Sequence, residues 1–239
     1  FFSSRRRHTR FRNVTGVQTC ALPILFITAD PGESRVHWSV NAIMNDGALI
    51  VIDWGTVLSI EDLGTAEFRN ARCYPLAGTD TMLSPEVGFS DSGHATNRVY
   101  DMCATPPPPS ARAKFRWWPM KGASTRTGTY TTSKIRSHPM LELYVYVDHS
   151  VKTEMYGIRI GEGKAPAITI PVDADKIRPG DERGLINGLM GQKLITVGDH
   201  EEWKKVLHDH YGDTIKQAIV AGWIASYGAQ NGTGDGRVG

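Results

Sequence analysis

The sequence has little cysteine, no long apolar run and no large excess of charge of one sign. Three cysteines occur in 239 residues, and none forms a Cys-x-x-Cys pair. This scarcity excludes a disulfide scaffold and a structural zinc site of common spacing, and it is typical of a reducing compartment. No stretch reaches 18 apolar residues, so we expect no membrane span, and no signal peptide is recognisable.

The first 24 residues differ in character from the rest of the chain. They contain five arginines and no acidic residue, which is typical of a basic interaction tail. However, the runs VTGVQTCALPI and SRRRHTR match translated sequencing-library adapter DNA, so we interpret residues 1–24 as a non-biological, adapter-derived segment. Without them, 22 basic residues stand against 25 acidic ones, a net charge of −3. Any nucleic-acid contact must therefore come from a local patch.

Roughly 215 residues remain, enough for one large domain with a full core. We expect that domain over residues 25–230 and a disordered tail over residues 231–239. Its first part predicts three successive strands, ILFITAD, SRVHWSVNAIM and ALIVIDWG, joined by turns at Asp-Pro-Gly and Asn-Asp-Gly. Strands joined by such short turns form an antiparallel meander.

Strands and helices alternate after this meander. We expect helices at residues 60–72, 201–207 and 213–227, the last one buried, and a further helix at HATNRVYDMCA that TPPPPS ends. We expect strands at PEVGFSDSG and AKFRWWPMKG, and a hairpin of LELYVYVD and EMYGIRI around HSVK. Residues 123–138 and 161–184 are predicted loops, the first of them mobile. This order predicts an α/β fold with a mixed sheet flanked by helices.

Three aspartates stand where such a fold could build a site. Asp30 ends the first strand, Asp91 ends a buried strand, and Asp213 opens the final helix. Taken singly, each is accounted for as a turn residue, a helix cap or a favourable charge at a helix N-terminus. As a set, they could converge at one edge of the sheet. Three carboxylates at one point repel each other unless hard cations such as Mg²⁺ or Mn²⁺ neutralise them.

Other conspicuous residues have simpler interpretations. In His208-Asp209-His210, residues two apart do not share a helix face, so we interpret the run as a solvent-facing turn. Trp117 and Trp118 point to opposite faces of a strand, which favours core packing over base stacking.

Five segments resemble, in order, the nuclease domain of bacteriophage terminase large subunits of the lambda-like GpA type. They are ITADPGESRVHWSVNAIMNDGALIVIDWG, FSDSGHATNRVYDMC, WWPMKGAS, LYVYVDHSVKTEMYGIRI and HDHYGDTIKQAIVAGWIA. The resemblance covers nearly all of residues 25–228, and the DSGH…T…VY…C block is its most specific part. It implies a ribonuclease-H-like fold in which an antiparallel meander precedes the further strands.

The resemblance also implies roles for individual residues. Asp30, Asp91 and Asp213 would be catalytic ligands of two Mg²⁺ or Mn²⁺ ions, which lie about 4 Å apart in such nucleases. Lys152, and with it Asp148, would lie in the family's Asp-to-Lys hairpin and position the phosphate. Nucleic-acid contacts would come from four basic residues, namely Lys121, Arg126, Lys134 and Arg136. For the loop residues among them, a simple solvated loop is an equal alternative.

The sequence departs from the family at two places. The nearest approach to a P-loop is GEGKAPA, where Ala165 replaces the required Ser or Thr, so this chain should not hydrolyse ATP. Tyr211-Gly212 stands where family members carry a small and an apolar residue before the last acid. Asp209 is therefore the alternative to Asp213.

The resemblance implies a metal-dependent endonuclease that cuts concatemeric viral double-stranded DNA during genome packaging in the host cytoplasm. Its partners would be an N-terminal ATPase domain, a small terminase subunit and a portal. Two alternatives remain: a catalytically silent DNA-binding or motor-docking module, and another ribonuclease-H-like nuclease of the resolvase or transposase type. Convergence of the three acids distinguishes an enzyme from the silent module.

Overall fold

The computed structural model describes residues 23–124, 129–161, 166–181, 184–198, 200–207 and 209–231. The adapter-derived interpretation of residues 1–22, the contact expected of Arg126, the departure at Ala165 and the predicted tail beyond Asn231 lie outside these ranges. No helix in the described part of the chain is long and apolar enough to span a membrane.

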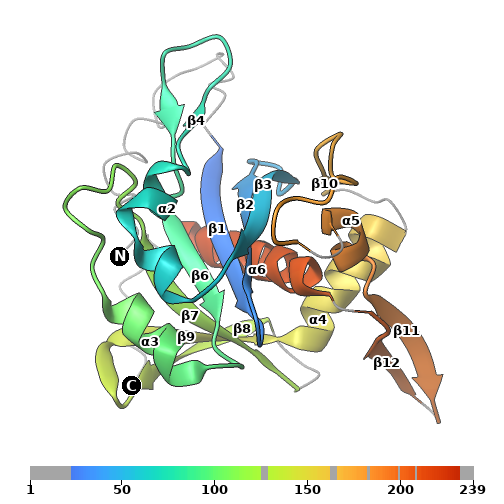
Figure 1. Ribbon diagram of the computed structural model, residues 1–239. Helices are drawn as coiled ribbons and strands as arrows, with labels where there is room; N and C mark the ends of the chain where they lie inside the picture. Colours follow the sequence, from blue (N-terminus) through green and yellow to red (C-terminus); the bar gives the residue numbers. More distant parts are fainter. Residues whose placement is uncertain are drawn as a thin grey trace.

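One eight-stranded mixed sheet forms the centre of the molecule (Figure 1). Its strands lie in the order β10-β3-β2-β1-β6-β7-β9-β8. The predicted antiparallel meander is confirmed as β1 (Ile24–Pro31), β2 (Val36–Ile43) and β3 (Leu49–Val57). The predicted α/β class, a mixed sheet flanked by helices, is likewise confirmed.

Three further strands continue the sheet from β1 in parallel. They are β6 (Val87–Asp91), β7 (Arg116–Ala123) and β9 (His138–Val147). The two outermost strands of the sheet are β8 (Tyr130–Ile135), which is antiparallel to β9, and β10 (Ile168–Thr169), which is parallel to β3. Because β1, β6, β7 and β9 run the same way, their carboxyl ends meet at one edge of the sheet.

Helices cover both faces of this sheet. The long helix α6 (His210–Asn231) packs on one face, whereas α2 (Ala66–Asn70) and α3 (Thr96–Ala104) lie on the other (Figure 1). Consecutive side chains of β2 point to opposite faces of the sheet: Trp38 contacts Phe68 of α2, and Ser39 forms a hydrogen bond with Thr214 of α6. Trp117 and Trp118 are buried, which confirms their expected place in the core.

The remaining elements are short and lie around this framework. They are the 3₁₀ turn η1 (Glu61–Gly64), α4 (Asp148–Lys152), the π-helical η2 (Thr153–Gly161), α5 (Gly184–Leu189), and two ribbons: β4 (Tyr74–Pro75) with β5 (Met82–Leu83), and β11 (Gln192–Val197) with β12 (His200–Lys205).

Several expected elements differ from the structure. The single helix over residues 60–72 is broken, because Thr65 leaves helical geometry and caps α2 by accepting a hydrogen bond from the Phe68 amide. The prediction of a loop over residues 123–138 is wrong for Tyr130–Ile135, because these residues form β8 and pair with β9. The predicted helix over residues 201–207 is wrong, because residues 201–205 belong to β12 and pair with β11. In each of the last two, cross-strand pairing overrides the local pattern.

The expected hairpin around HSVK is also wrong. After β9 the chain enters α4 at Asp148 and continues directly into η2, so Asp148 and Lys152 lie one helical turn apart. Met155 and Tyr156 are buried against the core. The apolar residues of EMYGIRI are thus buried by helical packing, which their composition alone does not distinguish from a strand.

Candidate active site

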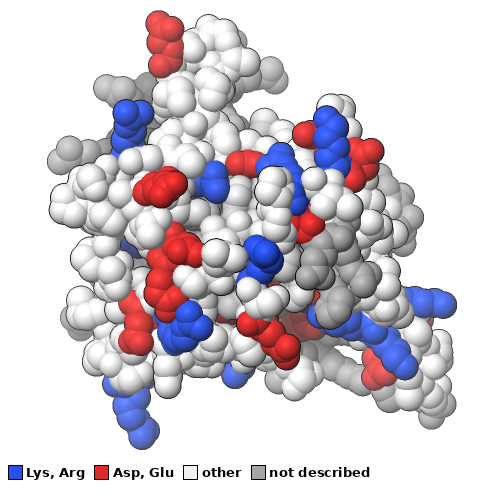
Figure 2. Space-filling view, in the orientation of Figure 1, with Lys and Arg blue, Asp and Glu red and all other residues white. Residues whose placement is uncertain are grey.

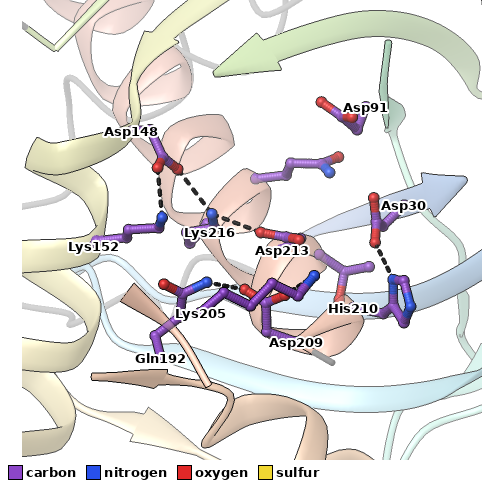
Figure 3. A network of polar contacts seen from close by, with 12 residues as sticks. Asp30, Asp91, Asp148, Lys152, Gln192, Lys205, Asp209, His210, Asp213 and Lys216 are labelled. Atoms are coloured by element: carbon purple, nitrogen blue, oxygen red, sulfur yellow. Dashed lines mark hydrogen bonds and ion pairs between the residues drawn. The ribbon is translucent and has the colours of Figure 1, made fainter. Parts of the chain in front are cut away.

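Asp30 and Asp91 end two neighbouring parallel strands. Ala29 of β1 pairs with Ser90 of β6, so the following residues, Asp30 and Asp91, stand at the same level of the sheet. Residues at the same level of a parallel pair point to the same face. The two carboxylates therefore lie beside each other at the carboxyl-end edge (Figure 3). The sequence predicted this convergence from the position of each acid in its strand.

A buried polar network fixes the start of α6 over this edge. The Ser39 hydroxyl on β2 donates to Oγ1 of Thr214 at 2.9 Å, and the Gln217 amide donates to the backbone carbonyl of Ala29 at 3.2 Å. Ser39 also accepts a hydrogen bond from Asn41 at 2.9 Å. Because Thr214 and Gln217 are fully buried, these bonds set the height and rotation of the helix. Asp213 is thereby placed beside Asp30 (Figure 3).

The ionisation of the acids reflects their closeness. Burial, and then the negative charge of Asp30, raise the pKa of Asp91 from 3.8 to about 6. Burial also raises the pKa of Asp213 to about 7, with the charges of Asp30 and Asp209 acting in the same direction and Lys216 opposing them. The folded protein thus disfavours the ionised form of both acids. Shifted pKa values of this kind are common at functional sites. Asp30 is the charge that acts on both.

Two lysines and two aspartates form a chain of alternating charge behind the acids (Figure 3). Lys152 Nζ lies 2.7 Å from Asp148, and Lys216 Nζ lies 2.8 Å from the other oxygen of Asp148. Lys216 Nζ also lies 2.6 Å from Asp213. Burial alone raises the pKa of Asp148, but the charges of Lys216 and Lys152 outweigh it and lower that pKa. Lys152 therefore contacts Asp148 and reaches Asp213 only through Lys216.

The segment before α6 is part of the site, contrary to the expected solvent-facing turn. Asp209 is 1% exposed, its carboxylate lies 2.5 Å from Lys205 Nζ, and it accepts a hydrogen bond from Gln192. The β11–β12 ribbon that carries Lys205 and Gln192 buries it. The first residue of α6, His210, points instead to Asp30, with Nδ1 2.7 Å from Oδ2. His208 lies outside the described residues.

The basic residues proposed to contact DNA are divided between two ends of the sheet. Lys121 follows Met120, the residue that pairs with Asp91, and its charge lowers the pKa of Asp91. Lys134 and Arg136 lie beside the turn between β8 and β9, at the start of β9, and Lys134 pairs with Glu142 at 2.9 Å. That turn is at the opposite end of the sheet from the acids, so the structure groups Lys121 alone with them.

A cavity of about 320 Å³ lies next to the acids, and His210, which contacts Asp30, is one of the residues that line it. His210 stacks on His37 with ring centroids 4.2 Å apart, and both rings line the cavity together with Arg35 and Gly180. Burial and the neighbouring His210 lower the pKa of His37 to about 4, so His37 is neutral at physiological pH. The ring of His210 thus contacts Asp30 and also lines the cavity.

Among the residues that the structure describes, no three His, Cys, Asp or Glu side chains are grouped so that they could hold a metal ion as they stand. Two acids instead have basic side chains as partners, Asp30 that of His210 and Asp213 that of Lys216. The donor chemistry nevertheless suits a hard divalent cation, because carboxylate oxygens are its preferred ligands. Burial, and after it the negative charge of Asp30, raise the pKa of Asp91, so a cation bound beside these two acids would favour their ionised forms.

Lys216 and His210 are the site residues that the sequence pattern did not reveal. Lys216 stands three residues after Asp213 on the same helix face, a spacing that brings opposite charges together. This spacing was the available signal for Lys216. His210 has no comparable local signal, because its partner Asp30 is 180 residues away.

No protein-family model and no curated protein matches the chain. What the site can do chemically follows from its own side chains: three carboxylates, which are the kind of ligand that a hard cation prefers, and a lysine and a histidine that contact two of them.

Proposed function

We propose that this chain is the nuclease domain of a phage terminase large subunit, a metal-dependent endonuclease that hydrolyses phosphodiester bonds of double-stranded DNA. The observation that carries the proposal is the meeting of Asp30, Asp91 and Asp213 at one sheet edge, with the pKa of two of them raised by burial and by the charge of Asp30. A silent DNA-binding module has no need of buried, mutually repelling carboxylates, whereas a cation-dependent enzyme does.

The topology supports a ribonuclease-H-like fold. An antiparallel meander, β3-β2-β1, is followed by the parallel strands β6 and β7, and α6 packs against β1 and β2. This is the order that the resemblance to terminase nuclease domains implies. The acids also come from the implied places: the first strand, the strand parallel to it, and the last helix.

Asp30, Asp91 and Asp213 would hold Mg²⁺ or Mn²⁺. Such an ion, when bound, supplies a nucleophilic water and stabilises the leaving oxygen. The chain's own residues prepare the acids for this task. His210 fixes the rotamer of Asp30, and Lys216 fixes that of Asp213. Lys121, which follows the residue that pairs with Asp91, would contact a phosphate of the bound strand.

The charge distribution supports a local mode of DNA binding. On the face drawn in Figure 2, the described acidic and basic side chains are interspersed, and no broad area of one sign is visible. In the intact protein, an N-terminal ATPase domain, the small terminase subunit and the portal would bring concatemeric DNA to this edge in the host cytoplasm. Specific positioning by partners would then substitute for long-range electrostatic attraction.

Nicking of supercoiled plasmid by the full chain in the presence of Mn²⁺ tests this function. We expect nicking that EDTA abolishes and that Asp91→Asn reduces by at least about 100-fold, because a ligand amide no longer carries the charge that the cation needs. Asp80→Asn is the matched control, since Asp80 is exposed in the turn between β4 and β5. Nicking that survives Asp91→Asn would reject this site.

A further inference from the structure

Lys216 is a buried cation within the candidate site. Its side chain is 3% exposed, and its ammonium group lies between two carboxylates, 2.6 Å from Asp213 and 2.8 Å from Asp148 (Figure 3). A lysine without partners at this depth would lose its proton, because burial disfavours the ammonium form. The two aspartates outweigh this effect and raise the pKa of Lys216 well above its ordinary value.

The charges around Lys216 divide the site into two halves. Asp213 and Asp148 balance Lys216 and Lys152, so this half is neutral without any added ion. On the other side, Asp30 and Asp91 carry two negative charges when ionised, and among the described residues only His210 is ion-paired with either. A divalent cation is therefore attracted to Asp30 and Asp91 but meets the ammonium of Lys216 when it approaches the occupied oxygen of Asp213.

We propose that Lys216 takes the place of a second divalent ion at Asp213, so that the site binds one ion, with Asp30 and Asp91, rather than two. The proposal rests on the nuclease function above and deepens it by assigning the positive charge near Asp213 to the protein itself. Lys216 is a positioning residue in this scheme, because it acts on the reacting groups through Asp213. In this scheme Asp213, one of the three acids named above as ligands, is held by Lys216 instead of by an ion, and Asp30 and Asp91 hold the single ion.

The number of Mn²⁺ ions bound by the full chain, measured by titration calorimetry at pH 7.5 without DNA, tests the proposal. We expect one ion per chain for the wild type. Lys216→Met keeps the length of the side chain but removes its charge, which leaves Asp213 and Asp148 without a shared cation. We expect this variant to bind two ions. Adding Asp213→Asn to Lys216→Met should restore a single ion.

Lys152→Met is the matched control. Lys152 lies in the same network, is only 12% exposed and contacts the same Asp148, but it does not contact Asp213. Its removal should leave the count at one ion. Circular dichroism establishes that each variant is folded, and the wild-type count decides the question even where Lys216→Met does not fold.

The outcomes separate the two proposals. Two ions bound to the wild type would overturn the role of Lys216 and leave the nuclease function standing. A single ion in folded Lys216→Met would also overturn it. No ion in the wild type, together with no metal-dependent nicking, would overturn the nuclease function itself and this inference with it.

Discussion

The Nδ1 atom of His210 lies 2.7 Å from the Oδ2 atom of Asp30, which joins the first residue of α6 to the carboxyl end of β1. The hydrogen bond with Asp30 raises the pKa of His210, although burial opposes it. The pair thus favours the protonated form of His210, and the acid that the candidate site needs is also the acid that holds the start of its helix.

Replacing His210 should cost stability in a pH-dependent way. A histidine whose pKa is raised on folding stabilises the protein fully below its unfolded pKa of 6.5, and this contribution is lost as pH rises through the folded pKa. We expect His210→Gln to lower the free energy of unfolding by about 1–2 kcal/mol at pH 6 and by less at pH 9.

Urea unfolding at both pH values measures this difference. His138→Gln is the control, because His138 bonds to the exposed Asp101 at 3.0 Å, and surface pairs of this kind contribute little. An equal loss of stability at pH 6 and pH 9 for His210→Gln would contradict a charged His210.

Asp91→Asn should make the metal-free protein more stable at neutral pH. The folded pKa of Asp91, about 6, exceeds its ordinary 3.8, so the folded state binds the proton more tightly and loses stability as pH rises between these values. Asparagine removes the buried charge, and the gain is at most about 3 kcal/mol. Thermal unfolding in EDTA at pH 7.5 should therefore show a higher Tm for the variant, and at pH 3.5 the two proteins should converge. A lower Tm for Asp91→Asn at pH 7.5 would argue against repulsion from Asp30.

Thr214→Val should destabilise the protein by about 1–3 kcal/mol, because the Ser39 hydroxyl loses the acceptor of its buried hydrogen bond. Nicking should fall as well, since this bond sets the position of Asp213 on α6. Ser226→Ala, on the same helix, is the control: it removes only a bond to the helix's own Gly222 carbonyl. Chemical denaturation and plasmid nicking report the two effects, and a Thr214→Val protein as stable as Ser226→Ala would contradict the anchoring role of this bond.

Lys121 and Lys134 should differ in their effect on DNA affinity. Lys121 lies at the edge that carries the acids, whereas Lys134 lies near the turn between β8 and β9 and is paired with Glu142 in the middle of β9. We expect Lys121→Gln to weaken binding of a DNA duplex and to reduce the salt dependence by about one unit of slope, the signature of one lost phosphate contact. Lys134→Gln should change neither. Fluorescence anisotropy across a range of salt concentrations, in Ca²⁺ to prevent cleavage, distinguishes them, and equal effects would place the DNA elsewhere.

The meander and the strands β6 and β7 could be predicted from sequence because their information is local, whereas the outermost strands β8 and β10 were predicted as loop. Alternating apolar residues and the turns at Pro31-Gly32 and Asp46-Gly47 define the meander, and the position of each acid at the end of its element placed Asp30 and Asp91 together. The ends of parallel strands meet whatever lies between them, so this part of the site needed no tertiary detail.

The rest of the site depends on pairings that no local pattern encodes. Residues 201–207 have a helical composition, and only their partner strand β11 makes them a ribbon that buries Asp209. Lys152 was expected in a hairpin, but the chain after β9 is helical and places Lys152 one turn after Asp148, with which it forms an ion pair. The pair of Asp30 with His210 likewise exists only once α6 has docked.

This late docking has a consequence for how the protein is made. Asp30 and Asp91 lie in strands near the start of the fold, whereas Asp213 and its lysine lie on α6, more than 120 residues after Asp91. During synthesis the meander and its parallel neighbours leave the ribosome first, with two acids in place and no third. The three acids come together only when α6 has emerged and closed over the sheet. A nascent chain that lacks α6 would therefore lack Asp213 and Lys216, so the activity proposed above would arise only in the last step of folding.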